Sequence, residues 1–296
     1  MIFAFKNGAW RLTPGRIHLF GILNVTPDSF SDGGCFTTVE AARERALQIE
    51  AEGADAIDVG GESTRPGATP VSEEEEIARV LPVLADLRPR LKIPLSIDTT
   101  KAVVAAAALD AGAAIVNDVS GLARDPRMAE VVAASGAGLI LMHSRGDPRT
   151  MSALAAYGHV VEEVNRELAQ RFLAALRAGI PRERLAVDPG IGFAKTAEQS
   201  FAVLRELRRF TQADPGEAFA GRPVMVGLSR KSFLGGAMET RALPTLAAEL
   251  WAARQGARFI RTHDVGALRV ALQTWEAIAS AGLSPSPEPP RGNGRA

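Results

Sequence analysis

Polar and charged side chains stand at the ends of the short apolar runs in the middle of this chain. In chain order they are Asn24, Asp58, Asp98, Asn117, Met142-His143, Asp188, Ser229-Arg230-Lys231 and Arg261-Thr262-His263. The earlier runs end mostly in carboxylates and amides, whereas the last two end in cationic residues. Such a set can bind a substrate with hydrogen-bond donors at one end and negative charge at the other, because charge-assisted hydrogen bonds are the strong ones.

Two loops rich in glycine, proline and polar residues, 24–34 and 60–68, follow the first two runs. Loops of this kind can act as mobile lids over a pocket. Thr64-Arg65 in the second loop favours diphosphate binding, because an arginine gives bidentate contacts to phosphate oxygens. The alternative is a surface loop whose arginine contacts nothing.

The carboxylates also have purely structural interpretations. A single aspartate at a strand end often caps the next helix, although Thr99 or Thr100 could take that role from Asp98. Asp188 precedes Pro-Gly and could simply start a turn. Asp58 could hold the glycine loop that follows it.

The elements that must position these residues repeat one pattern, a short β-branched run followed by a helical stretch. Eight strands alternating with eight helices are typical of a (β/α)8 barrel, whose reactive groups lie where strands give way to loops. The rival fold, a doubly wound open sheet, usually has a glycine-rich phosphate loop after its first strand, and residues 24–28 lack one. The strand candidates are Ile17–Leu23, Asp55–Val59, Pro94–Ile97, Ala114–Asn117, Gly138–Met142, Leu185–Val187, Pro223–Gly227 and Arg258–Arg261.

Apolar stripes at helical spacing predict several of the helices between these strands. Ser72 and Glu75 have the spacing of a capping box at the start of the first stripe. The three clearest stripes are Ile77, Val80, Leu81, Leu84 and Leu87; Phe201, Leu204 and Leu207; and Leu268, Ala271, Leu272, Trp275 and Ile278.

The two ends of the chain differ from the middle. Residues 1–13 predict a β-hairpin with its turn at Asn7-Gly8. Residues 284–296 are rich in proline and have no large apolar side chain, so we expect a disordered tail. The predicted organisation is therefore a hairpin, one barrel over 14–283 and a tail.

Composition excludes several functional classes. Lys+Arg and Asp+Glu are 34 each, which argues against a nucleic-acid binder with a broad basic surface. Cys35 is the only cysteine, so zinc-finger, iron–sulfur and internal disulfide readings fail. The longest apolar run, 102–109, is far shorter than the ~20 residues of a membrane span. Because no signal peptide is recognisable either, we expect a soluble cytoplasmic protein without nucleic-acid or membrane partners.

Nucleophilic catalysis is not indicated, since the sequence offers no Ser-His-Asp or Cys-His arrangement. His143 is expected to be an ordinary histidine with satisfied hydrogen bonds.

Seven strings in order, over roughly residues 14–281, are similar to those of the dihydropteroate synthase family, the folate-pathway enzymes inhibited by sulfonamides. The resemblance implies a (β/α)8 barrel that joins (7,8-dihydropterin-6-yl)methyl diphosphate to 4-aminobenzoate, giving 7,8-dihydropteroate and diphosphate. The strings are residues 21–34, 58–67, 96–99, 117–118, 188–193, 229–232 and 261–264.

The resemblance also implies where the substrates bind. By this resemblance the pterin pocket comprises Asp98, Asn117, Met142, Asp188, Gly192, Lys231 and Arg261. The diphosphate residues are Asn24, Thr64, Arg65, Arg261 and His263, and Asn24 resembles the family's Mg²⁺ ligand. The 4-aminobenzoate residues are Phe30, Pro66, Phe193, Ser229 and Lys231.

We expect a dissociative mechanism in which Asp98, Lys231, Arg261 and His263 are catalytic. Diphosphate would leave with its charge held by Mg²⁺ and the cationic residues, and Asp98 would stabilise the pterin-methyl cation. The family often has Gly where this chain has Ala194, and Val where it has Thr262. A homodimer is expected by resemblance, through late helices around Leu246, Leu250 and Trp251.

Two alternatives stay open at this point. A pterin-dependent methyltransferase domain also binds a folate-type ring through Asp and Asn at strand ends, although it would not need the cationic residues together. A non-catalytic pterin-binding paralogue would have lost loop or anion-site residues.

Overall fold

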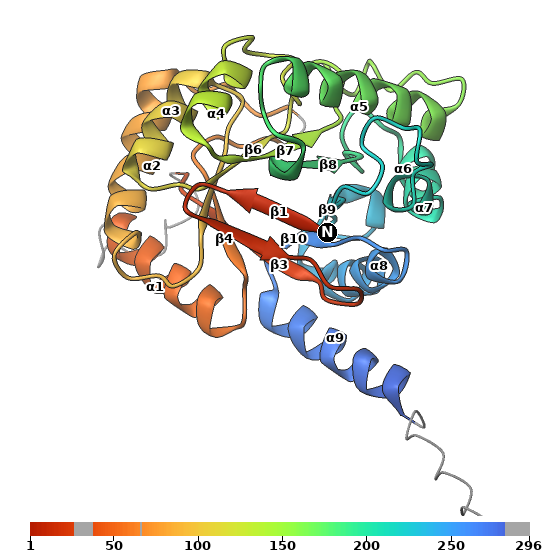
Figure 1. Cartoon of the computed structure of the whole chain (residues 1–296). Coiled ribbons are helices and arrows are strands. Elements are labelled where there is room, and N and C mark those ends of the chain that lie inside the picture. The colour runs from red at the N-terminus through yellow and green to blue at the C-terminus, as the bar shows by residue number, and fades with distance from the viewer. Residues whose placement is uncertain (27–37, 66, 282–296) are drawn as a thin grey trace, which may run out of the picture.

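Eight parallel strands form one barrel within the residues that the computed structural model describes, 1–26, 38–65 and 67–281. The strand order is β8-β7-β6-β5-β4-β3-β10-β9. A bridge between Val187 and Val224 joins β8 to the chain just before β9, so the sheet closes on itself. Helices surround the barrel (Figure 1), which confirms the predicted (β/α)8 fold.

Each predicted barrel strand is present, with its ends shifted by two residues at most. All are almost wholly buried, which explains why they read as continuous apolar runs rather than alternating ones. The strands are β3 (His18–Asn24), β4 (Ala56–Gly60), β5 (Leu95–Asp98), β6 (Ile115–Asp118), β7 (Gly138–Met142), β8 (Leu185–Asp188), β9 (Met225–Gly227) and β10 (Phe259–Thr262).

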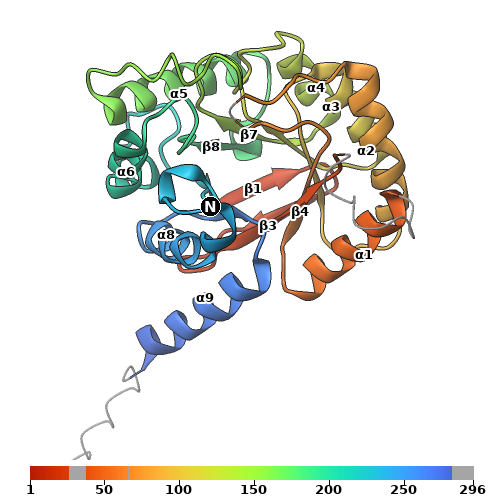
Figure 2. The same ribbon diagram turned by 180° about the vertical axis from the view of Figure 1, so that it is seen from behind.

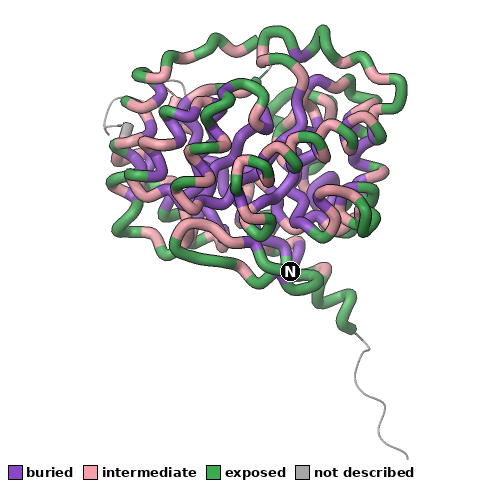
Figure 3. Tube along the Cα trace, turned by 45° about the horizontal axis from the view of Figure 1, so that its top comes forward, coloured by how far each residue is buried: buried purple, intermediate pink, exposed green. Residues whose placement is uncertain are grey.

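A helix follows each barrel strand, and the helices form the outer ring in both ribbon views (Figure 2). Buried residues gather inside this ring and exposed ones on its outside (Figure 3). None of the described helices is long and apolar enough to cross a membrane. The helices are α1 (Thr38–Ala51), α2 (Glu73–Leu87), α3 (Ala102–Ala111), α4 (Met128–Ser135), α5 (Val160–Arg177), α6 (Ala197–Arg205), α7 (Arg208–Thr211), α8 (Ala242–Arg254) and α9 (Val265–Ser280).

The predicted helical stripes are mostly buried, with two exceptions. Val80, Leu84 and Leu87 of α2 are in the core, as expected. Phe201 of α6 is 48% exposed and Ile278 of α9 is 69% exposed, so these two side chains lie in helices as predicted but not in the core. Ile278 is exposed because α9 extends beyond the barrel (Figure 1).

Two helix caps differ from the prediction. Ser72 Oγ accepts from Glu75 N at 3.1 Å, but the Glu75 carboxylate pairs with Arg79, so the capping box is incomplete. At α3 the predicted threonine cap was wrong, because Asp125 Oδ2 accepts from Ala102 N at 3.0 Å. Asp125 comes from the next βα unit and could not be recognised by local spacing.

A β-hairpin of β1 (Ile2–Phe5) and β2 (Gly8–Arg11) covers the amino-terminal end of the barrel (Figure 1). Its turn is Lys6-Asn7, one residue earlier than predicted. Asn7 takes a positive φ of 65°, which asparagine tolerates better than most residues. The rings of Phe3 and Phe259 lie 5.1 Å apart, edge to face, so the hairpin belongs to the barrel core. The predicted tail, 284–296, lies outside the described residues.

The barrel interior has two successive layers, because side chains two residues apart on a strand point the same way. The lower layer is an apolar cluster that includes Phe20, Ala56, Ile115, Ile140, Ala186, Met225 and Phe259. The next residues on the same faces are Ile22, Asp58, Asn117, Met142, Asp188, Gly227 and Arg261. The polar upper layer therefore lies at the carboxyl ends of the strands, which we call the mouth.

Candidate active site

Arg261 of β10 connects the aspartates of β4 and β5 across the mouth, and the amide of Asn117 on β6 joins the same group through Asp58. Its Nε donates to Asp58 Oδ2 at 2.5 Å and its Nη2 to Asp98 Oδ2 at 2.8 Å. Asn117 Nδ2 also donates to Asp58 Oδ2, at 3.0 Å. Four strand ends far apart in the sequence thus meet in one hydrogen-bonded group.

Asp58 is the central residue of this group, although sequence analysis did not assign it to a substrate. Its side chain is fully buried and bonds to Arg261 and Asn117, rather than holding the glycine loop as the structural alternative had it. The available signal was its place in the series of polar strand ends, which puts it in the same layer as the other acids.

Two buried carboxyl oxygens face this group without a partner. Among the described residues, Asp58 Oδ1 and Asp98 Oδ1 have no hydrogen bond. Burial raises the pKa of Asp98 to about 7, although the nearby Arg261 guanidinium opposes the shift. Because unpaired buried acceptors are costly, a ligand that brings N–H donors would be bound strongly here.

The opposite wall is formed by the ends of β8 and β9. Asp188 Oδ1 accepts from Gly190 N at 2.7 Å. Lys231 Nζ donates to the carbonyl of Ile191 and lies 4.2 Å from the centre of the Phe193 ring. Burial lowers the pKa of Lys231 to about 8 and raises that of Asp188, while each charge favours the other. This wall combines an acid, a cation and an aromatic face.

Two glycines allow the loop after β8 to approach the site closely. Gly190 has φ 64°, and a Cβ there would lie 1.8 Å from the carbonyl oxygen of His143 and 3.4 Å from Met142 Cγ. Gly192 has φ 82°, and its Cβ would lie 2.8 Å from Lys231 Cδ. The predicted pterin residues Met142 and Gly192 therefore border the same wall as Lys231.

His263 and Ser229 form a pair at the ends of β10 and β9. Ser229 Oγ lies 2.8 Å from His263 Nδ1 and accepts from His263 N at 3.2 Å. Burial, with Arg261 and Arg230 nearby, lowers the pKa of His263 to about 3. The low pKa indicates that the ring is neutral in the absence of substrate and offers hydrogen bonds rather than the expected positive charge. Ser229, predicted for 4-aminobenzoate, contacts a predicted diphosphate residue.

The loop after β4 covers one side of the mouth. Thr64 lines a cavity together with Asp98 and Phe193. Gly67 N donates to Pro148 O at 2.8 Å, which joins this loop to the one after β7. Arg65 is exposed and close enough to contribute to the lowered pKa of His263.

A buried ion-pair group fixes the base of that loop. Lys101 Nζ donates to Glu62 Oε2 at 2.6 Å and to Glu76 Oε2 at 2.5 Å. The two carboxylates raise the pKa of Lys101 despite its burial. Sequence analysis missed this group because its members come from three different elements.

Asn24, the predicted Mg²⁺ ligand, lies at the end of β3 beside Gly60. A Cβ on Gly60 would be 3.7 Å from Asn24 Oδ1 and 3.8 Å from Asp98 Oδ2, so both oxygens border one small space. The described residues contain no cluster of three His, Cys, Asp or Glu suited to a metal ion. One amide oxygen at the mouth fits Mg²⁺, which binds few protein ligands and completes its shell with water and substrate phosphates. Phe30 and Pro66 lie outside the described residues.

The fold and site define a class of protein, a (β/α)8 barrel enzyme with an acidic pocket and cationic side chains at its mouth. Residues 20–263 match the model of the family described as pterin binding enzyme. Dihydropteroate synthase of Synechocystis sp. is 43% identical over 268 residues, which cover 89% of this chain and 90% of the relative.

Two solved structures of Xanthomonas albilineans dihydropteroate synthase are also similar. The one with 4-aminobenzoic acid has 44% identity and a TM-score of 0.84, covering 92% of this chain and 96% of that one. The one in complex with 7,8-dihydropteroate has 40% identity and a TM-score of 0.84, covering 95% and 100%. The chain therefore belongs to the dihydropteroate synthase family, as the sequence motifs predicted.

Proposed function

We propose that this chain is a dihydropteroate synthase that joins (7,8-dihydropterin-6-yl)methyl diphosphate to 4-aminobenzoate and releases diphosphate. The observation that carries the proposal is the pair of unpartnered buried oxygens on Asp58 and Asp98, beside Arg261 and opposite Lys231. Solved relatives whose titles name 4-aminobenzoic acid and 7,8-dihydropteroate support it.

The pterin ring fits the floor of the mouth. Its edge is a guanidine-like set of N–H donors, and Asp188 can accept from it, because charge-assisted bonds are strong. Asn117 offers both a donor and an acceptor, and Met142 and Gly192 border the ring. Arg261 presents a flat guanidinium that can stack on the ring.

The diphosphate fits the side of the mouth formed by Asn24, Thr64, Arg65, Arg261 and His263. Arg65 and Arg261 supply positive charge. When Ser229 donates its hydroxyl proton to Nδ1, the neutral His263 keeps a proton on Nε2 for a phosphate oxygen. Bound Mg²⁺, held by Asn24 and substrate phosphates, would neutralise charge on the leaving diphosphate.

The reaction breaks the methylene C–O bond, and the electron pair leaves with diphosphate. A carboxylate at Asp98 stabilises the positive charge that develops on the pterin-methyl group. The 4-aminobenzoate nitrogen then forms the new C–N bond and loses a proton. Phe193, under the Lys231 ammonium, provides an aromatic face for its ring. No side chain needs to act as a nucleophile.

One assay tests the proposal. The purified chain is mixed with the pterin diphosphate, 4-aminobenzoate and Mg²⁺, and dihydropteroate and released diphosphate are measured. Equal amounts of both products are expected. Pterin binding without product would favour a non-catalytic paralogue, and methyl transfer from a methylated pterin would favour the methyltransferase alternative.

A cytoplasmic homodimer remains part of the proposal. Of the residues predicted for the interface, Trp251 is 42% exposed, whereas Leu246 and Leu250 are half-buried against the core. The indole N–H of Trp251 donates to Leu204 O at 3.2 Å, so one edge of this ring already makes a contact within the chain. Molecular mass in solution tests the dimer.

A further inference from the structure

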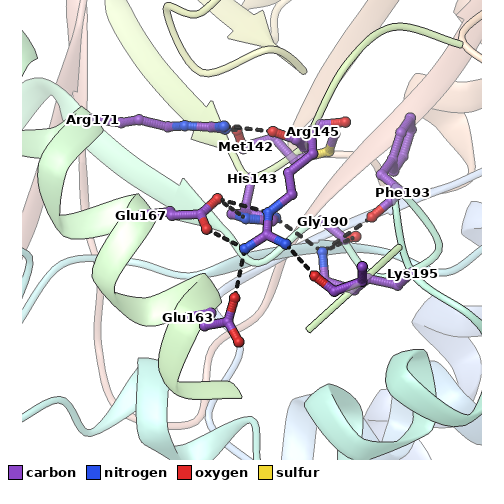
Figure 4. A network of polar contacts seen from close by, with 11 residues as sticks. Met142, His143, Arg145, Glu163, Glu167, Arg171, Gly190, Phe193 and Lys195 are labelled. Carbon is purple, nitrogen blue, oxygen red and sulfur yellow. Dashed lines mark hydrogen bonds and ion pairs between the residues drawn. The ribbon is translucent and has the colours of Figure 1, made fainter. Parts of the chain in front are cut away.

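The loop after β8, residues 189–195, is held by a second lysine behind the substrate wall. Lys195 Nζ lies 3.0 Å from Gly190 O, 3.1 Å from Phe193 O and 3.0 Å from His143 Nδ1 (Figure 4). Together with the contact from Lys231 to Ile191 O, lysines hold three carbonyls of this short loop. The same loop supplies Gly192 and Phe193 to the substrate wall.

The ring of His143 is fully buried, and its protonation follows from its neighbours. The pKa of Glu167 is lowered by its hydrogen bond with His143, so its carboxylate can only accept; the ring proton therefore sits on Nε2, and Nδ1 is left as an acceptor facing Lys195. Nε2 lies 2.9 Å from Glu167 Oε2, which accepts it. Burial and the Lys195 charge lower the pKa of His143 to about 3, so the ring is neutral. The expectation of a histidine with satisfied hydrogen bonds is confirmed, and one of its two partners, Lys195, also binds the loop that lines the substrate wall.

Helix α5 anchors this chain of contacts. Glu163, Glu167 and Arg171 are spaced by four residues and therefore share one face of the helix. Arg145 binds Glu167 and, at 2.8 Å, Glu163, while Arg171 donates to Met142 O at 2.7 Å (Figure 4). A rigid helix thus fixes the loop after β7 and, through His143 and Lys195, the loop after β8.

The protonation of Lys195 follows from its surroundings. Burial lowers the pKa of Lys195 well below its ordinary value. Three acceptors nevertheless surround Nζ, and only the ammonium has a donor for each.

We propose that Lys195 is a positioning residue for the reaction, acting through the carbonyls of Gly190 and Phe193 rather than on a substrate. This inference rests on the proposed function. The Gly190 N–H orients Asp188, and the Phe193 backbone sets the ring under Lys231, so a shift of the loop would misplace both. Lys195 holds both carbonyls directly, but Asp188 is also fixed as the last residue of β8, whereas Phe193 lies within the loop. The ring of Phe193, and with it 4-aminobenzoate binding, should therefore depend on Lys195 most.

The test is Lys195→Met, which keeps the aliphatic stem and removes the ammonium. The expected result is a KM for 4-aminobenzoate raised about 10-fold or more, with KM for the pterin diphosphate changed by less than about 3-fold. Amide hydrogen exchange of residues 190–195 should also become faster. That second readout needs no activity.

Lys6→Met is the matched control, because Lys6 Nζ donates to Leu109 O at 2.7 Å at the opposite end of the barrel. It should lower Tm and leave both KM values unchanged. Glu167→Gln is a second variant, which keeps an acceptor for His143 and removes a charge. We expect it to raise KM for 4-aminobenzoate about 3-fold. If Lys195→Met does not fold, this variant tests whether the contacts of Lys195 position the loop.

The proposal is overturned if the Lys195 and Glu167 variants lose stability as Lys6→Met does but keep both KM values and the exchange rates of 190–195. A wild-type chain that forms no dihydropteroate would instead overturn the proposed function. In that case faster exchange in Lys195→Met would still support its hold on the loop.

Discussion

The two interior layers of the barrel use the same strands for opposite purposes. On β10, Phe259 belongs to the apolar lower layer and Arg261 to the mouth; on β4, Ala56 and Asp58 are related in the same way. The lower layer is filled mainly by rings and aliphatic groups beneath the hairpin, whereas the mouth contains buried carboxylate oxygens without partners. The apolar lower layer therefore stabilises the fold, and the mouth above it keeps unpaired groups that are available to substrates.

Backbone strain follows the same division. The described non-glycine residues with positive φ are Asn7, Leu122, Ala194 and Arg230. Only Asn7 lies in the hairpin, and asparagine tolerates this conformation. The other three lie in the loops after β6, β8 and β9, at the mouth. Strain gathers where the substrates are proposed to bind, which is common at functional sites.

The largest effect on activity is expected from Asp98→Asn, which tests whether the mouth carries the catalytic groups. Removing the charge should lower kcat by about 10²–10³-fold, because transition-state charge is no longer stabilised. Pterin binding should weaken much less, so the dissociation constant for the pterin should rise only slightly. Steady-state kinetics and calorimetric binding measure the two effects. Ser96→Ala is the control, since Ser96 is fully buried two residues earlier on β5, in the lower layer, and its hydroxyl has no partner among the described residues. Turnover that survives Asp98→Asn would refute the catalytic role of Asp98.

The opposite result is expected for Phe3→Ala in the lower layer. Phe3 is fully buried against Phe259, and losing its ring should lower the free energy of unfolding by about 3–5 kcal/mol. Both KM values should stay at the wild-type level well below the new Tm. Urea unfolding and kinetics at low temperature check this. A raised KM without lost stability would contradict the division between the layers.

The barrel was predictable because its signal is repeated and local. Each strand is a buried apolar run that ends in a polar residue, and a barrel places all such ends at one mouth. The partners of those residues were not predictable. Arg261 and Asp58 are 203 positions apart, and Asp125 caps a helix that begins 23 residues before it. Neither pairing leaves a trace in local spacing.

Charge was the other property that the sequence did not determine. His263 was predicted as part of a cationic group, yet its pKa depends on burial and on neighbouring arginines that only the fold brings together. Arg261 was read as a cation toward substrate, while the structure pairs it with two carboxylates. Residue type indicated the class of ligand, and packing decided which groups carry charge.

Glu249 of α8 is a buried acid that lies outside both interior layers, so it shows what an unpaired acid does away from the mouth. It hydrogen-bonds Thr262 on the outer face of β10, its Oε1 has no partner among the described residues, and burial raises its pKa to about 8. The folded chain therefore keeps a proton that the unfolded chain loses near pH 4.5. This contribution to stability is complete below pH 4.5 and is lost as the pH rises to about 8.

Glu249→Gln should remove that slope, so the variant gains about 2–4 kcal/mol relative to wild type between pH 5 and 8. Urea unfolding across this range measures it, and kcat should not change. If kcat fell while the pH slope stayed, Glu249 would belong to the site rather than to the helical layer.

Ala194→Gly gives the smallest expected effect and tests whether strain is concentrated at the mouth. Ala194 is buried with φ 46°, a conformation that costs a residue with a Cβ roughly 1–2 kcal/mol, while glycine adds its own entropy cost. The net gain in unfolding free energy should be about 0.5–1 kcal/mol, with kcat unchanged. Asn7→Gly in the hairpin, at φ 65°, should gain less, because asparagine already tolerates its conformation. Equal gains at both positions would mean that the mouth loops are no more strained than the hairpin. The contrast between the two ends would then rest on the unpaired carboxylate oxygens of the mouth alone.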